Sequence, residues 1–131
     1  MTLETALVAE LDGAAGLVAL VETRIEPVLN AQSNVWPALT YQQISGPLDY
    51  SHDGPGMTYP RFQLTATATT FTQVVAVMSA ARAALEGDHA DFGGEGERAT
   101  VFVENQFDSY AAESGETGVY VRRCDVVIWT T

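Results

Sequence analysis

The sequence predicts an α+β fold: a four-stranded, mainly antiparallel sheet packed against two helices, in the order α-β-β-α-β-β. Three observations lead to this fold class. Apolar residues recur at helical spacing in residues 2–21 and 70–87, they alternate with polar residues in residues 59–69, and two further strand-like runs close the chain. With 131 residues and 47% hydrophobic content, residues 1–131 suffice for a single domain with its own core.

The first helix is expected in residues 2–21. Its apolar stripe consists of Leu3, Leu7, Val8 and Leu11. Thr2 is a candidate N-cap, Asp12-Gly13 interrupts the pattern, and residues 14–21 offer one or two further turns. Pro27 is expected to end the helical region, and residues 26–36 read as irregular chain.

Two strands are expected to pair antiparallel across a segment rich in proline and glycine. The first strand covers residues 38–45 and the second follows Tyr59-Pro60. One face of the second strand is apolar, formed by Phe62, Leu64, Ala66 and Ala68; the other carries Arg61, Gln63, Thr65, Thr67 and Thr69. Residues 45–59 between the strands are expected to form a loop.

The second helix begins at a capping-box pattern of Thr70 with Gln73 and ends near Gly87. Its stripe, expected to lie in the core, is Phe71, Val74, Val75, Met78, Ala81, Arg82 and Leu85. Residues 88–97 are acidic and glycine-bearing, and we expect a loop there.

The last two strands are expected over residues 99–110 and 119–130. In the final strand Cys124, Val126 and Ile128 share one face, while Val127 and Trp129 share the other. Both faces therefore carry bulky apolar groups, and each needs a cover. We expect the helices on one side and a neighbouring subunit on the other.

The charge balance disfavours general phosphate binding and anionic membranes. Seventeen acidic residues face six basic ones, all arginine, for a net charge of −11. The N-terminus lacks the basic region of a signal peptide, and the apolar stretch at residues 14–21 is too short to span a bilayer, so we expect synthesis in the cytosol. Cys124 is the only cysteine and is expected to be a buried thiol. Arg122 and Arg123 should point to opposite faces, with at least one paired to an acid.

Two histidines lie among acidic residues. His52 stands near Asp49 and Asp53, and His89 near Asp88 and Asp91. Such clusters can hold a metal or carry out acid–base chemistry, but the same residues are those that turns select, and the calcium-loop spacing is missing. We find no nucleotide-binding, nucleophile-elbow, CxxC or HExxH motif, and expect no cofactor, no metal and no enzymatic activity.

The combination of three segments resembles the tail terminator, or tail completion, family of long-tailed bacteriophages and prophages. The segments are WPALTYQQISGP (residues 36–47), RFQLTATAT (residues 61–69) and a helix ending RAALEG (residues 82–87), and the likeness spans about residues 3–87. This chain departs from the family in having small residues near Ala66 and Ala68, where a bulky aromatic is common. Residues 88–98 look like a variable insertion.

The resemblance implies a non-enzymatic subunit that forms a ring, commonly a hexamer, at the head-proximal end of the tail tube. The ring would stop tube polymerisation and present the surface that joins the head. Its partners would be further copies of the chain, the tail tube protein and the head–tail connector protein. DNA would pass through the lumen without specific binding, and the location would be the tail–neck junction of the virion, with no membrane.

Residues 45–59 would then contact a neighbour, the tube or the connector. The interface residues expected are Tyr50, Met57, Tyr59, Arg61, Gln63 and Trp129. Two alternatives remain: a head-completion adaptor or minor tail protein of the same neck region, and a small ligand-binding domain or enzyme that uses His52 or His89.

Overall fold

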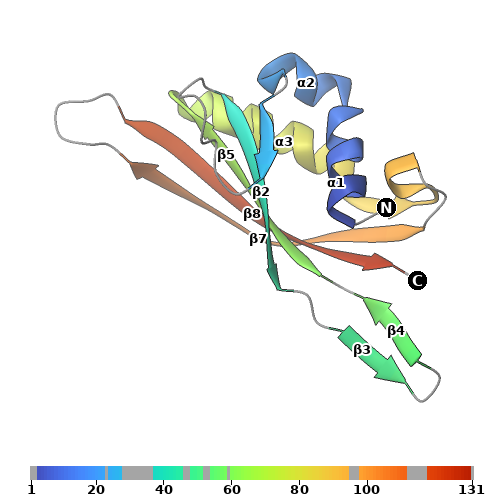
Figure 1. Ribbon diagram of the computed structural model, residues 1–131. Helices are drawn as coiled ribbons and strands as arrows, with labels where there is room; N and C mark the ends of the chain where they lie inside the picture. Colours follow the sequence, from blue (N-terminus) through green and yellow to red (C-terminus); the bar gives the residue numbers. More distant parts are fainter. Residues whose placement is uncertain are drawn as a thin grey trace.

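The computed structural model describes residues 3–22, 24–27, 37–45, 48–51, 54–58, 60–94, 98–111 and 118–130, of which 3, 45, 48–51, 54–58 and 111 are described by their backbone alone. Three α-helices lie on one face of a sheet (Figure 1). The helices are α1 (Leu3–Asp12), α2 (Ala15–Val21) and α3 (Phe71–Leu85), with a short 3₁₀ turn η1 (Phe92–Gly94). The strands are β1 (Ile25–Pro27), β2 (Ala38–Ser45), β3 (Leu48–Ser51), β4 (Gly54–Thr58), β5 (Arg61–Ala68), β6 (Gly87–His89), β7 (Ala99–Ala111) and β8 (Val119–Thr130).

β8 is the centre of the sheet. It pairs antiparallel with β5 from Arg61↔Val127 to Ala68↔Tyr120, and on its other side with β7 along the whole of that strand. β2 pairs antiparallel with β5, as the sequence predicts, and β1 adds to β2 in the parallel direction. β6 pairs with the first three residues of β7. The α+β class is confirmed, but the four-strand, two-helix description is too small: the described residues contain eight paired strands, and the first helix is divided in two.

The segment between β2 and β5 differs from the expected loop. β3 and β4 form a hairpin there, with Leu48 opposite Thr58, and Thr58 in turn lies opposite Thr130 of β8. Proline and glycine suggested a break in the chain here. Pro55 is nevertheless tolerated in β4, because β4 is paired with β8 only at Thr58, so the missing N–H of Pro55 removes no bond to β8.

Two other expectations about irregular chain were wrong. Pro27 does not end a helix: α2 ends at Val21, and Pro27 is the last residue of β1, at an edge where its missing N–H is tolerated. Residues 88–97 were expected to form a loop, but β6 and η1 occupy much of this stretch.

The core lies between the helices and the sheet, as the periodicity predicts. From the helices it contains Leu7, Leu11, Leu17, Val21, Val74, Val77, Met78, Ala81 and Leu85; β5 contributes Phe62, Leu64, Ala66 and Ala68. The α3 cap is confirmed, because Thr70 Oγ1 accepts the backbone N–H of Gln73 at 3.3 Å. Three residues of the predicted stripe lie outside the core. Phe71, in the first turn of α3, is 41% exposed and packs against Tyr120; Val75 is only partly buried; and Arg82 is partly exposed and pairs with Glu86.

The stretch that resembles a variable insertion is anchored to α1. Phe92 is buried, and the backbone N–H of Gly93 donates to Glu10 Oε1 at 2.8 Å. Gly93 adopts φ +73, and a Cβ placed there would lie 2.6 Å from the Cα of Ala6. Only glycine permits this backbone conformation together with such close approach to a helix. The insertion therefore includes a residue that completes the core.

Candidate interaction surface

The sheet has one face toward the helices and one away from them. Alternation along the strands places a set of polar and aromatic side chains on the second face, which we call the outer sheet face. It includes Thr40, Gln42, Arg61, Gln63, Thr65, Thr67, Thr100, Phe102, Glu104, Asn105, Phe107, Ser109, Val121, Arg123, Asp125, Val127 and Trp129. Its centre is polar, and three exposed aromatic residues lie on the β7–β8 side.

The expectation that the outer sheet face carries bulky apolar groups in need of a cover is met only in part. Val127 is 5% exposed, so neighbouring side chains of the same chain already bury it. Trp129 is 38% exposed and Phe102 is 50% exposed, so these two rings still present apolar area to a partner.

Arg61 and Gln63, both expected at an interface, lie side by side in a network on the outer sheet face. Arg61 pairs with Glu104 of β7 and approaches Asp125 of β8 at 3.8 Å. Gln63 Nε2 donates to Asp125 Oδ1 at 3.2 Å. The network ties three strands together and leaves the Arg61 charge compensated within the chain.

Trp129 lines an open groove of about 540 Å³ at the end of the sheet where β6 joins β7. The other lining residues are Asp88, His89, Arg98, Ala99, Thr100 and Phe102. Thr100 Oγ1 donates to Asp88 Oδ1 at 2.7 Å, which holds β6 and β7 together at the groove. An aromatic floor with one arginine at its side suits a protein contact better than a small charged ligand.

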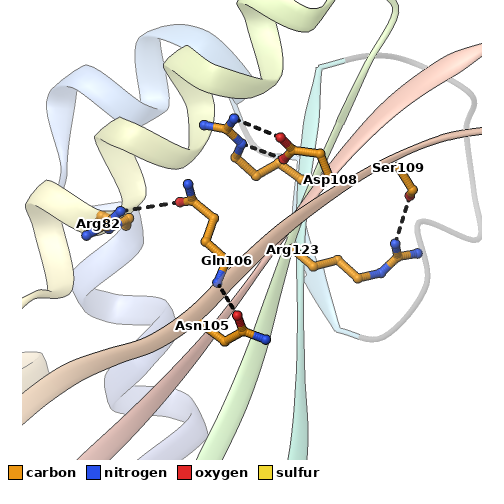
Figure 2. A network of polar contacts seen from close by, with 7 residues as sticks. Arg82, Asn105, Gln106, Asp108, Ser109 and Arg123 are labelled. Atoms are coloured by element: carbon orange, nitrogen blue, oxygen red, sulfur yellow. Dashed lines mark hydrogen bonds and ion pairs between the residues drawn. The ribbon is translucent and has the colours of Figure 1, made fainter.

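The adjacent arginines of β8 point to opposite faces, as predicted. Arg122 lies on the helix side, bonds both carboxylate oxygens of Asp108 at 2.7 and 3.0 Å, and stacks over Phe71 at 5.3 Å. Arg123 lies on the outer sheet face and donates to Ser109 Oγ at 3.1 Å (Figure 2). The Arg122 guanidinium hydrogen-bonds the Asp108 carboxylate and so holds the pKa of Asp108 below its ordinary value.

An arginine of α3 also contacts β7, from the helix side of the sheet. Arg82 of α3 donates to Gln106 Oε1 at 3.3 Å and pairs with Glu86 at 3.4 Å, and Figure 2 shows its guanidinium directed at β7. In the N-terminal region, Arg24 Nε donates to the Pro37 carbonyl at 2.8 Å. Four arginines therefore pair with carboxylates of the same chain, namely Arg24, Arg61, Arg82 and Arg122, and the large excess of acid dominates the surface potential.

An aromatic cluster that sequence reasoning missed joins Phe71 of α3 to Tyr110 and Tyr120 of the β7–β8 hairpin. Tyr110 and Tyr120 face each other across the strands with ring centroids 4.8 Å apart, and Phe71 meets Tyr120 at 6.1 Å. Tyr110 is 57% exposed. The positions of the two predicted strands and of the turn between them already place Tyr110 opposite Tyr120, so this cross-strand pair could have been predicted from the sequence.

His89 has a local structural role. One ring nitrogen, Nε2, lies 2.6 Å from the carbonyl of Leu85 near the end of α3; the other, Nδ1, lies 3.9 Å from Glu10 Oε2. The ring also packs edge-on against Phe92 at 5.2 Å. Within the described residues no group of three or more His, Cys, Asp or Glu side chains is suited to hold a metal ion. His52 lies outside the described residues.

The remaining expected residues divide into two sets. Cys124 is confirmed as a buried thiol, and burial raises its pKa. Tyr50 and Met57 belong to β3 and β4, where only the backbone is described, and Tyr59 lies outside the described residues. None of the helices in the described part of the chain is both long and apolar enough to cross a membrane.

Comparison with known proteins agrees with this architecture. A chain in a solved structure described as the virion of a native gene transfer agent particle superposes with a TM-score of 0.73 at 18% sequence identity, over 98% of this chain and 92% of that one. This likeness shows the fold. No curated protein matches. The family model described as tail completion protein gp17 matches residues 5–131, which is nearly the whole chain. The chain therefore belongs to the tail completion protein gp17 family.

Proposed function

We propose that this protein is a structural component of a phage-like virion that assembles as a ring at the head-proximal end of the tail tube. In this position it ends tube polymerisation and supplies the surface to which the head is joined. The observation that carries the proposal is the family match across residues 5–131. The fold shared with a chain of a gene transfer agent virion supports it.

The shape of the subunit suits contacts with several partners. The β3–β4 hairpin projects from one end of the sheet, and the β7–β8 hairpin projects from the opposite end (Figure 1). Different surfaces at opposite ends allow head-to-tail contacts, which close into a ring when the rotation between copies permits. The exposed rings of Phe102, Trp129 and Tyr110 supply apolar area of the kind enriched at protein interfaces.

The charges suit a conduit for DNA. A net charge of −11, with four of the six arginines paired to carboxylates of the same chain, leaves few cations that could displace counterions from a phosphate backbone. DNA that passes such a surface is repelled weakly rather than held. The role proposed is therefore mechanical and not enzymatic, and His52 and His89 have no catalytic part in it.

The test removes residues 49–56, which include most of the β3–β4 hairpin. Because the backbone of this hairpin projects beyond the part of the sheet that the helices cover (Figure 1), the variant should keep the unfolding midpoint of the parent while phage tails become irregular in length and fail to join heads. Ala83→Ser, an exposed change on α3, serves as the control and should leave tails normal. Normal tail length and head joining in the deletion phage would contradict the proposal.

Electron microscopy of virions with a labelled chain gives the position. Label at the head-proximal end of the tube supports the proposal. Label on the head connector alone would indicate a head-completion adaptor, and label along the tail would indicate a minor tail protein.

A further inference from the structure

The outer edge of β7 is paired with another described strand only at its beginning. β7 contains 13 residues, and β6 covers it only from Ala99 to Val101. Beyond Val101 no other strand in the described part of the chain pairs with that side of β7. An open edge of this kind is a template for a strand from another chain, and proteins usually block such edges with proline, lysine or a covering element.

Pairing geometry identifies which backbone groups point outward from this edge. Ile128 N–H donates to the Pro60 carbonyl at 3.1 Å, so the even-numbered residues of β8 bond toward β5 and the odd-numbered ones toward β7. Tyr120 and Arg122 are even-numbered, and they lie opposite Tyr110 and Asp108. The N–H and C=O groups of Asp108 and Tyr110 therefore face away from β8.

Gln106 provides an independent check on this assignment. It lies opposite Cys124, which is also even-numbered, so its N–H should point outward. That N–H is capped by the side chain of its neighbour, Asn105 Oδ1, at 3.0 Å (Figure 2). The bulge between Val103 and Asn105 and this cap close the edge up to Gln106, and the edge is open at Asp108 and Tyr110.

The open part of the edge carries little charge. Asp108 is the only ionisable acid between Gln106 and Tyr110, and Arg122 binds it through both oxygens. A strand from another acidic chain can therefore approach without strong repulsion.

The same molecule has a second free edge on the opposite side of its sheet. β3 is the last strand in the pairing order and has β4 as its one partner among the described strands. Its sequence from Leu48 to Ser51 has a single acid, Asp49. The two free edges lie on hairpins at opposite ends of the molecule (Figure 1). The helices pack on one face of the sheet, and no described strand lies beside either edge.

We propose that the open edge of β7 at Asp108–Tyr110 pairs with β3 of the next copy, so that neighbouring subunits share one hydrogen-bonded sheet. Because the two edges differ and lie at opposite ends, the contact is head-to-tail and propagates around a ring. This inference rests on the proposed ring and names the strands that join its subunits. The occupant is a second copy of this chain.

The first test replaces Tyr110 with proline. Proline removes an N–H that points away from β8, so the β7–β8 ladder is kept, while the bond to the neighbouring copy is lost. The matched control is Tyr110→Ala, which removes the same side chain but keeps the N–H. We expect the fraction of tube ends that carry rings to fall about tenfold more in Tyr110→Pro than in Tyr110→Ala at the same protein concentration. Equal ring formation in the two variants would overturn the pairing.

A second measurement holds even if the proline variant folds poorly. In a Cys124→Ala background, a Tyr110→Cys chain is mixed with chains that carry cysteine at each position of β3 in turn, and tails are assembled with tail tube protein. Strands paired in a sheet have Cα atoms about 4.5–5.5 Å apart, within the range of a disulfide. We expect a disulfide between the two kinds of chain for at least one β3 position, and none when the second cysteine is at Thr72 of α3 instead.

The outcomes separate this inference from the proposed function. Rings on tube ends without a β7–β3 disulfide, or with disulfides only between two Tyr110→Cys chains, would overturn the strand pairing and leave the ring intact. Absence of rings in the parent protein would overturn both.

Discussion

Replacing Gly93 with alanine should destabilise the protein by about 2–4 kcal/mol, which is a large share of the roughly 5–15 kcal/mol that typical domains have. Two effects add. The backbone at Gly93 has φ +73, where a residue with a Cβ is less stable by about 1–2 kcal/mol. The new Cβ would also lie 2.6 Å from the Cα of Ala6, and relieving that contact requires η1 to move off α1, at about 1–3 kcal/mol. Alanine also lowers the conformational entropy of the unfolded chain, which offsets at most about 1 kcal/mol of this destabilisation.

Gly94 is the matched control, because its φ of +78 is nearly the same while no atom lies within 4 Å of its added Cβ. Gly94→Ala should therefore cost only about 1 kcal/mol, the dihedral part. Urea unfolding followed by far-ultraviolet circular dichroism measures both, with unchanged m-values as the check that the comparison is valid. Equal destabilisation by the two variants would refute the close packing of η1 on α1.

Other predictions concern single groups. Asp108→Asn should reduce the loss of stability in acid. The pKa of Asp108 is lowered in the folded protein, so the stability that its ionised carboxylate contributes is present above about pH 4 and is lost as pH falls through the lowered pKa. Unfolding midpoints from pH 7 to pH 2 that are the same in parent and variant would contradict this. Because the pair is surface-exposed, the effect should stay below about 1 kcal/mol. Cys124 should react with a thiol reagent at pH 8 at least about a thousandfold more slowly than in urea-unfolded protein, since burial raises its pKa and blocks access; comparable rates would mean that the sheet opens readily. Thr70→Ala should cost about 1 kcal/mol through loss of the cap on Gln73, with Thr70→Ser close to the parent in thermal unfolding.

The sequence predicted the long elements well, because their periodicity is strong. The bounds of β8 agree with residues 119–130, β2 agrees with residues 38–45, and the buried face of β5 is the apolar one. These segments have enough alternating or helical positions for the burial of one face to decide the structure.

The short elements were missed because their stability comes from tertiary contacts. β1, β3, β4 and β6 contain three to five residues each, and the glycine and proline residues within or beside them indicated turns. Pairing with a neighbouring strand outweighs that local preference. The burial of Phe92 could not be read from an acidic, glycine-rich stretch, since it depends on the approach of η1 to α1.

The interaction surface was predicted only in outline. Arg61, Gln63 and Trp129 do lie on the outer sheet face, but the pairing of Arg61 with Glu104 and Asp125 joins residues that are 43 or more positions apart, and no local pattern reveals it. Whether these side chains contact a partner remains a prediction.

Assembly of tail tubes in the presence of the purified chain tests the central claim most directly. Tail tube protein is polymerised with and without the chain, and the tube ends are imaged by electron microscopy. We predict that added chain stops elongation and that one end of each tube carries a ring with a central hole. Tubes that keep growing at the same rate, with bare ends and the chain left in solution, would contradict the account.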